Sequence, residues 1–290
     1  MATEIGTKVQ NFYNKTPFPD YELDRFNKRE DLINAVYPFA KLLDRSIPEN
    51  ASIIDVGTGT GQLSAFLSLR RKKVYGIDFS DSSLDKAKKL KKKLNLKTWN
   101  LEKIDILDSE QIEKLGKFDY VLCLGVLHHT GNAYGGFKNI LKLLNPQGKI
   151  AVGLYNNFGR IPLKVRITLA KTIFKNNQKI KDSFIKMQIG DVEDKERARG
   201  WWNDQYLHPH ETTHSIGEVL NWFKKNDIEY IETVPSTKIF DQSNLEIAGV
   251  WNKCDVGYPN FLVRAGKQLM WILNNQREGG YWITFGKLKN

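Results

Sequence analysis

The most constraining feature of this chain is a glycine-rich turn that follows a short apolar run. Residues 52–62 read Ser-Ile-Ile-Asp-Val-Gly-Thr-Gly-Thr-Gly-Gln, so glycine stands at every second position from Gly57 to Gly61. Such a run is typical of a buried strand that enters a tight turn and then a helix. Glycine lets the backbone approach a ligand closely, and the start of a helix offers unpaired N–H groups. The pattern therefore predicts an α/β domain that binds a ligand at this turn.

The spacing of the glycines separates two classes of cofactor. A dinucleotide fingerprint has glycine at its first, third and sixth positions, the last for close packing of the helix beneath a pyrophosphate. Here the sixth position is Gln62, and the order is Gly-x-Gly-x-Gly after an acidic residue. This order resembles the first motif of the class I S-adenosylmethionine-dependent methyltransferases, in which the loop surrounds the methionine moiety. The resemblance implies S-adenosyl-L-methionine as cofactor, with contacts from Asp55, Gly57, Thr58, Gly59 and Gly61.

Later segments follow the same family in the same order. A second apolar run ends at Asp78, where a carboxylate can accept hydrogen bonds from two ribose hydroxyls. Asp105 and Ile106 stand where the family places an acid for the adenine amino group and an apolar residue against the ring. Residues 118–125 read as the fourth strand, and residues 143–152 resemble the turn into the fifth. The resemblance thus adds further cofactor contacts: Asp78, Phe79, Asp105, Ile106 and Leu124.

Strand and helix patterns alternate over residues 50–155, which predicts a parallel sheet with helices on both faces. The resemblance implies a doubly wound sheet of seven strands, mostly parallel. Its last strand, over residues 279–286, is expected to pair antiparallel between the fifth and the sixth. Before the first strand, residues 4–14 carry apolar residues on one helical face, and a loop with two prolines follows. We expect a second helix from about residue 25 to 45.

The chain divides into a core and added segments. We expect residues 1–49 to form an N-terminal helical cap, and residues 50–156 with 213–290 to form the methyltransferase core. Residues 157–212 depart from the family pattern and are interpreted as an inserted helical lid. A second helical insertion is expected near 235–279, with a helix from residue 261 to 273.

The composition of the chain bears on its location and on the class of partner that it binds. Hydrophobic residues make up 41% of the chain, but no apolar stretch is long enough for a membrane span, and the first residues lack the pattern of a secretory signal. With two cysteines a disulfide framework is not supported, so a cytoplasmic location is expected. The net charge of +11 invites a nucleic-acid interpretation, but lysines cluster on one face of a predicted helix over residues 84–97. We favour a solvated helix face and leave an anionic surface or polynucleotide as the alternative.

All five histidines lie in two short stretches. His128 and His129 follow the fourth strand, where the family places residues that face the transferred methyl group. Either could act as a general base, which is needed only if the acceptor is protonated at neutral pH. His129 is favoured because related chains often carry histidine there. The alternative is that one of the pair packs against or caps the following turn.

The second stretch contains His-Glu-x-x-His, a zinc-protease signature. That motif needs both histidines one turn apart on a helix, whereas Pro209 and a capping box at Ser215 predict a helix that starts only after His214. No metal site is predicted. We interpret the region, with two N-terminal tyrosines, as substrate-facing, although packing explains the aromatic residues equally well. The substrate candidates are Tyr13, Tyr21, Trp201, Tyr206, His208 and His210.

The leading functional hypothesis is a methyltransferase that acts by direct displacement on an oxygen, nitrogen or sulfur atom of a small molecule enclosed by the lid. The basic charge supports an alternative acceptor, RNA or protein. A non-catalytic cofactor-binding partner protein is a third hypothesis, which the intact glycine and acidic positions argue against. The sequence does not indicate the oligomeric state.

Overall fold

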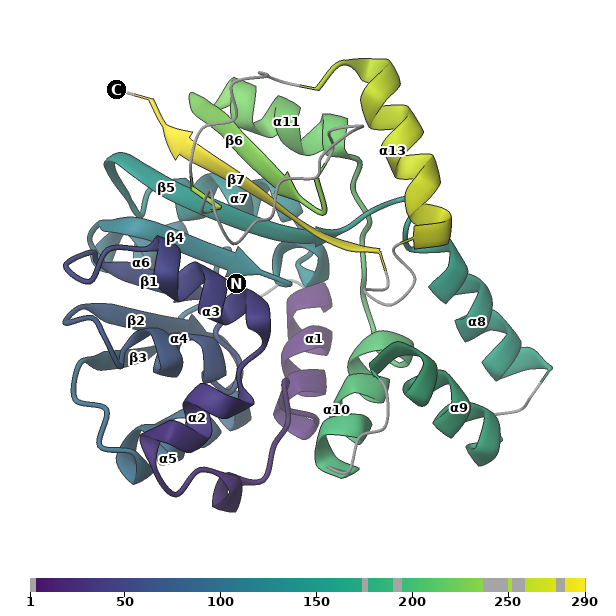
Figure 1. Cartoon of the computed structure of the whole chain (residues 1–290), viewed down its shortest axis with the longest axis horizontal. Coiled ribbons are helices and arrows are strands. Elements are labelled where there is room, and N and C mark those ends of the chain that lie inside the picture. The colour runs from purple at the N-terminus through teal and green to yellow at the C-terminus, as the bar shows by residue number, and fades with distance from the viewer. Residues whose placement is uncertain are drawn as a thin grey trace.

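One seven-stranded sheet organises the computed structural model (Figure 1). The structure describes residues 4–173, 177–189, 195–236, 250, 251, 259–274 and 280–289. The strands are β1 (Ile53–Val56), β2 (Val74–Asp78), β3 (Trp99–Lys103), β4 (Phe118–Leu124), β5 (Leu144–Tyr155), β6 (Ile228–Val234) and β7 (Tyr281–Leu288). Their order is β3-β2-β1-β4-β5-β7-β6, and β7 runs antiparallel to both of its neighbours. The predicted fold class and the reversed last strand are confirmed.

Helices cover both faces of the sheet. The core helices are α4 (Gln62–Leu67), α5 (Asp81–Lys93), α6 (Ser109–Lys114), α7 (Ala133–Leu141) and α11 (Ile216–Lys225), and a short 3-10 turn, η2 (Leu127–His129), follows β4. Successive strand residues point to opposite faces. Ile53 accordingly joins the apolar cluster beneath the N-terminal helices, while Ile54 joins the cluster around Phe137 and α11. The sheet is therefore buried on both sides, as a largely parallel sheet requires.

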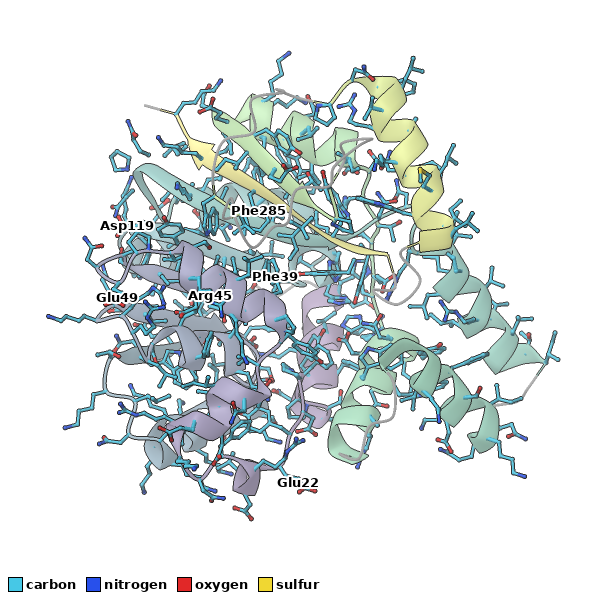
Figure 2. The ribbon with its side chains drawn as sticks, in the orientation of Figure 1. Glu22, Phe39, Arg45, Glu49, Asp119 and Phe285 are labelled. Atoms are coloured by element: carbon cyan, nitrogen blue, oxygen red, sulfur yellow. The ribbon has the colours of Figure 1, made fainter. Side chains whose placement is uncertain are left out.

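The expected helical face over residues 4–14 is α1 (Glu4–Lys15). The expected single helix over 25–45 is instead divided into the 3-10 turn η1 (Leu23–Arg25), α2 (Arg29–Ala35) and α3 (Pro38–Ser46). The expectation was wrong because Pro38 disfavours helical geometry in the residue before it and suits the first position of a new helix. Tyr37 is accordingly extended, with φ −63° and ψ 154°. The break brings Phe39 against Phe285 of β7, with ring centroids 6.4 Å apart (Figure 2).

Two groups of helices lie outside the core. The segment after β5 forms α8 (Ile161–Thr172), α9 (Gln178–Ile189) and α10 (Lys195–Tyr206), and α13 (Phe261–Asn274) precedes β7. Helices were expected in the inserted segment 157–212 and over residues 261–273, and the structure has helices in both places. The remainder of the expected insertion, residues 237–249, 252–258 and 275–279, lies outside the described residues. In Figure 1, α9 and α10 lie near α1, on the side toward which the carboxyl ends of β4 and β5 point.

A buried arginine ties the N-terminal helices to the core. Arg71, after α4, donates to the Asp44 carboxylate at 2.5 Å and to backbone oxygens of Asp44, Ile47 and Leu67. Its side chain is fully buried, whereas the neighbouring Arg70, which also contacts Asp44, is 46% exposed. A buried charge is tolerated only when its hydrogen bonds are satisfied, and here several acceptors surround one guanidinium.

We expect Arg71→Met to lower the free energy of unfolding by about 3–5 kcal/mol, because it leaves buried acceptors without a donor. The matched variant Arg70→Met removes a half-exposed cation from the same carboxylate and should cost no more than about 1 kcal/mol. Urea denaturation followed by circular dichroism measures both. Equal losses for the two variants would contradict the assignment of Arg71 as the buried tie.

Candidate active site

The glycine turn after β1 is closed in by two neighbouring segments. Gly57 and Gly59 have φ values of +71° and +56°, which side-chain-bearing residues rarely adopt. A Cβ atom at Gly57 would lie 2.2 Å from the side chain of Val126, and one at Gly59 would lie 2.2 Å from the Phe18 carbonyl oxygen. Glycine is therefore required at both positions. The turn consequently holds the N-terminal loop and the segment after β4 at short distance.

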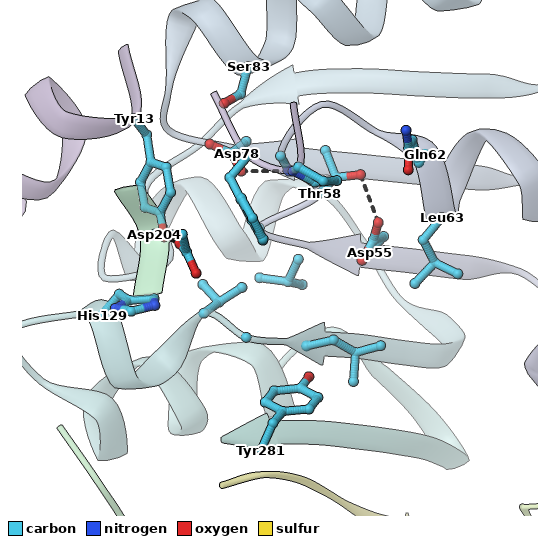
Figure 3. A pocket seen from close by; sticks show the side chains of 18 of the residues that line it. Tyr13, Asp55, Thr58, Gln62, Leu63, Asp78, Ser83, His129, Asp204 and Tyr281 are labelled. Atoms are coloured by element: carbon cyan, nitrogen blue, oxygen red, sulfur yellow. Dashed lines mark hydrogen bonds between the residues drawn. The ribbon is translucent and has the colours of Figure 1, made fainter. Parts of the chain in front are cut away.

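Asp78 lies beside this turn, at the carboxyl end of β2 (Figure 3). Its carboxylate accepts hydrogen bonds from the backbone N–H groups of Gly59 and Ser80, each at 2.8 Å. The side chain is buried, and burial raises its pKa even though the backbone donors oppose that shift. A carboxylate has about four acceptor positions, so two remain for a ligand. This arrangement suits the ribose diol that the family resemblance assigns to Asp78.

Asp55 occupies the end of β1 and accepts a 2.7 Å hydrogen bond from the Thr58 hydroxyl. Burial raises the pKa of Asp55 to about 6. At the opposite side of the turn, the Asp105 carboxylate accepts from the Leu107 N–H at 2.9 Å. Both acids therefore have local hydrogen bonds that fix their orientation.

One cavity of about 1150 Å³ connects these residues with the region beyond β4. The expected cofactor residues that line it are Asp55, Gly57, Thr58, Gly59, Asp78, Phe79, Asp105, Ile106 and Leu124. Gly61 does not line the cavity. A Cβ there would lie 2.4 Å from the Trp99 ring of β3, so glycine at this position allows close packing against that ring. The volume exceeds the usual upper size of about 1,000 Å³ for a small-molecule site, so the cavity has space for a cofactor and an acceptor together.

His129 lines the same cavity from η2 (Figure 3). Its Nδ1 lies 3.0 Å from the carbonyl oxygen of His210. A carbonyl oxygen only accepts, so the neutral ring carries its hydrogen on Nδ1 and keeps Nε2 as its acceptor. Burial lowers the pKa of His129 to about 3, which keeps the ring neutral at physiological pH. The geometry thus presents a neutral proton acceptor at this end of the cavity.

His128 lies in a different environment. Its side chain is fully buried and packs against Tyr155, with ring centroids 4.2 Å apart, and it does not line the cavity. Within the described part of the chain neither ring nitrogen has a hydrogen-bond partner. Burial lowers the pKa of His128 well below that of free histidine. The structure therefore favours the packing alternative for His128, whose catalytic role stays a prediction.

A buried polar network borders the cavity beside His129. The Tyr13 hydroxyl donates to Asp204 at 2.9 Å, and the Gln205 amide donates to Asp204 at 2.8 Å and to the Tyr155 hydroxyl at 2.6 Å. Arg160 continues the network by donating to Gln205 at 2.6 Å. Tyr13, Tyr155, Asp204 and Gln205 all line the cavity. Burial raises the pKa of both Tyr13 and Asp204, so the tyrosine is a neutral hydrogen-bond donor.

Sequence reasoning did not place Tyr155 or Gln205 in the site. Tyr155 is the last residue of β5. Ligands bind at the carboxyl ends of parallel strands in such sheets, so this position could have identified Tyr155 as a site residue from the sequence. Tyr281 lines the cavity from the start of β7, which reaches the same edge because that strand is reversed. Gln205 lies on α10, outside the family pattern, and no sequence signal pointed to it.

Several expected substrate residues are placed elsewhere. Of the candidate set, Tyr13 and Trp201 line the cavity, whereas Tyr21, Tyr206, His208 and His210 do not. Tyr21 is buried beside Phe26 and donates its hydroxyl hydrogen to the Thr60 carbonyl at 2.8 Å. Tyr206 stacks on Trp202, with ring centroids 4.0 Å apart, inside the small apolar cluster of α8–α10. The structure therefore favours the packing alternative for Tyr21 and Tyr206, whose role in substrate binding stays a prediction.

The remaining histidines support neighbouring segments. The ring of His208 lies 3.7 Å, centroid to centroid, from that of His129, and burial lowers the pKa of His208 to about 3. The Nε2 of His210 lies 3.1 Å from the Thr130 carbonyl oxygen. His208 thus packs against His129 without lining the cavity itself. The backbone oxygen of His210 positions the His129 ring.

The His-Glu-x-x-His stretch is not helical. Residues 207–215 form an extended connection between α10 and α11, in which Glu211 pairs with Arg160 and His214 lies 2.9 Å from the Glu218 carboxylate. Ser215 caps α11 as expected, by accepting from the Glu218 N–H at 3.1 Å. Among the described residues no group of three or more histidine, cysteine or acidic side chains could hold a metal ion.

The chain is similar to known methyltransferases. A family model described as a methyltransferase domain matches residues 47–244. The ubiquinone biosynthesis O-methyltransferase of Rickettsia bellii strain OSU 85-389 is 31% identical over 106 residues, which are 36% of this chain and 42% of that protein. The match therefore spans less than half of this curated relative's length.

Solved structures show the same fold. PKMT2 from Rickettsia typhi superposes with a TM-score of 0.59 at 20% identity, over 86% of this chain and 52% of that chain. The same protein in complex with AdoHcy gives a TM-score of 0.58 at 20% identity, over 88% and 53% of the two chains. The family model covers more than half of the chain, and the strand order and glycine turn agree with it. The chain therefore belongs to the methyltransferase-domain family.

Proposed function

We propose that this chain is a class I methyltransferase that uses S-adenosyl-L-methionine and acts on a hydroxyl oxygen of a small aromatic molecule that carries an apolar group. The observation that carries the proposal is the single cavity that joins the Asp78 region, the His129 ring and an apolar wall. S-adenosylmethionine, when bound, supplies a methyl group on a positively charged sulfur, so a nucleophile displaces a neutral leaving group. The protein then has to hold the acceptor, remove its proton and exclude water.

The cofactor end of the proposal rests on the glycine turn and its neighbours. The backbone of Gly57 and Gly59 would approach the amino-acid part, where no side chain intervenes. Asp78 would accept from the ribose hydroxyls with its remaining acceptor positions. Asp105 and Ile106 would contact the adenine. All of these residues line one side of the cavity.

The acceptor end rests on His129 and the aromatic side chains around it. Tyr13, Tyr155, Trp201 and Tyr281 line the cavity and suit a flat aromatic ring. His129 Nε2 takes the proton from the acceptor hydroxyl as the oxygen attacks the methyl carbon. The positive charge that forms on the imidazole lies near the buried network of Asp204. The relatives named O-methyltransferases support an oxygen acceptor.

The apolar wall extends the cavity away from His129. Tyr13 and His129 lie at one end of Figure 3, and Gln62 and Leu63 lie at the other. Val36, Phe39, Leu63, Val234 and Ile283 line this wall. Apolar surface in a binding site favours apolar ligand groups by roughly 25 cal/mol per Å² buried. We therefore propose that the wall holds the apolar part of the acceptor. We also propose that α8–α10 act as the lid at the His129 end, where Trp201, Asp204 and Gln205 of α10 line the cavity.

Asp78→Asn should weaken cofactor binding by about 10- to 100-fold, because a charge-assisted hydrogen bond contributes about 1.5–3 kcal/mol and the amide offers fewer acceptors. Calorimetric titration with S-adenosylmethionine measures the change. Asp81→Asn, a neighbouring substitution of an exposed acid that pairs with Lys103, is the control and should bind as the wild type does. Unchanged affinity of the Asp78 variant would remove its assignment to the ribose.

His129→Gln should lower kcat by about 10²- to 10⁴-fold and leave the cofactor Kd within about twofold, because the ring serves proton transfer rather than cofactor binding. His214→Gln, outside the cavity, should retain the wild-type rate. The ratio of wild-type to His129 variant rates should stay constant from pH 8 to about pH 6, since burial lowers the pKa of His129 to about 3. If this ratio of rates instead falls about tenfold per pH unit below pH 6.5, His129 titrates like an ordinary histidine and its pKa is not lowered by burial.

The class of acceptor is tested by offering the protein labelled cofactor together with hydroxylated aromatic compounds. One set of these compounds carries an alkyl chain and the other does not. The chain-bearing acceptor should have the lower KM, and Phe39→Ala should raise its KM several-fold while leaving the parent compound unaffected. Turnover should change little with salt. A polynucleotide acceptor that contacts several lysines would instead lose about 10³- to 10⁵-fold in affinity between about 50 and 200 mM salt. The latter result, or transfer only to protein, would support the alternative acceptors.

A further inference from the structure

Helix α13 has an unusual orientation, because Gln268 and Trp271 face the protein while five large apolar side chains are exposed. Inside, the Gln268 carboxamide oxygen accepts from the Asn156 amide and the Ile216 N–H, each at 2.9 Å. Trp271 is buried on the same side, against Trp282. These contacts fix the rotation of the helix about its axis. Whatever lies on the opposite arc is therefore directed away from the core.

That opposite arc is apolar along the whole helix. It consists of Phe261, Leu262, Ala265, Gly266, Leu269, Met270 and Leu273, which recur at the spacing of one helical face. The five large side chains of this set are between 51% and 78% exposed. Single exposed apolar residues are common, but a continuous apolar face marks an interaction surface. We call this set the α13 outer face.

Helix α8, which begins near α13, also carries exposed apolar side chains. The two helices follow one another along one side of the molecule (Figure 1), and a Cβ at Gly159, just before α8, would lie 3.6 Å from Trp271. Ile161 and Val165 of α8 are exposed as well. This side also faces the carboxyl ends of β4 and β5, where the cavity lies. The exposed apolar side chains thus continue beyond one helix.

The charges on these two helices are of one sign. Among the described side chains of the two helices, Lys164, Arg166, Arg264 and Lys267 are basic and Lys164 is exposed, and neither helix sequence contains an acidic residue. A second copy of the chain, which carries a net charge of +11, would bring like charges together. An anionic lipid surface offers both an apolar layer and the opposite charge, and each nearby lysine or arginine adds to the attraction.

We propose that the α13 outer face docks this enzyme on an anionic lipid surface, with the helix lying in the plane of the headgroups. At 14 residues α13 is about 21 Å long, too short to cross a bilayer. No helix in the described ranges is long and apolar enough for a span. The docking surface is separate from the cavity, so this inference does not depend on which acceptor the enzyme methylates.

The test is co-sedimentation of the full chain with vesicles. Wild-type protein should bind vesicles of phosphatidylcholine and phosphatidylglycerol in equal parts and bind pure phosphatidylcholine at least about tenfold more weakly. The variant Leu262→Glu/Leu269→Glu/Leu273→Glu should lose at least about tenfold in binding to the mixed vesicles. Its melting temperature and its methyl transfer to a water-soluble acceptor should equal the wild-type values, because the three side chains are exposed and lie outside the cavity.

A charge-matched control separates the α13 outer face from general basicity. Lys88→Gln/Lys89→Gln/Lys92→Gln on α5 changes the net charge by the same amount and should keep most of the vesicle binding. Binding lost in this control but kept in the leucine variant would assign docking to α5 and overturn the proposal. Absence of wild-type binding would overturn it too. So would a wild-type dimer in analytical ultracentrifugation that the leucine variant dissociates, since the face would then bind a second copy.

Discussion

The hydrogen bond from the Gly59 N–H to the Asp78 carboxylate connects the two strands on which the site is built. It is possible only because the turn after β1 adopts a backbone conformation that excludes a side chain, and the same exclusion lets Phe18 and Val126 contact the turn. His129 follows Val126 by a single short turn, η2. The glycine positions therefore set the distance between the cofactor region and the proton acceptor. An added methyl group would displace both at once.

The parts of the fold that depend on local pattern were predictable from the sequence. The apolar run before Gly57, the acid at Asp78 and the reversed last strand all follow from short-range signals or from family resemblance, and the sheet agrees with them. The break at Pro38 was also a local signal, but the sequence interpretation did not use it. The wrong prediction of a single helix concerned only the N-terminal helical cap.

The acceptor region was less predictable because tertiary packing creates it. Tyr13 and Tyr21 both belong to the N-terminal segment, yet one lines the cavity and the other is buried against Phe26. Nothing in the sequence distinguishes them. Asp204 and Gln205 enter the site only because α10 packs beside α1, and their burial requires partners from distant segments. A buried polar network of this kind is tolerated when its members satisfy one another.

Helix α13 shows why amphipathic periodicity alone does not reveal which face of a helix is buried. The sequence pattern predicted a helix at this position, and the ordinary assumption would bury its apolar arc. The structure places Gln268 inside instead, where two donors from different segments satisfy its oxygen. Burying that amide would cost free energy without these donors, whereas with them the cost is offset. Two hydrogen bonds and one tryptophan thus determine that the leucines face outward, which gives this methyltransferase an apolar surface beyond its core.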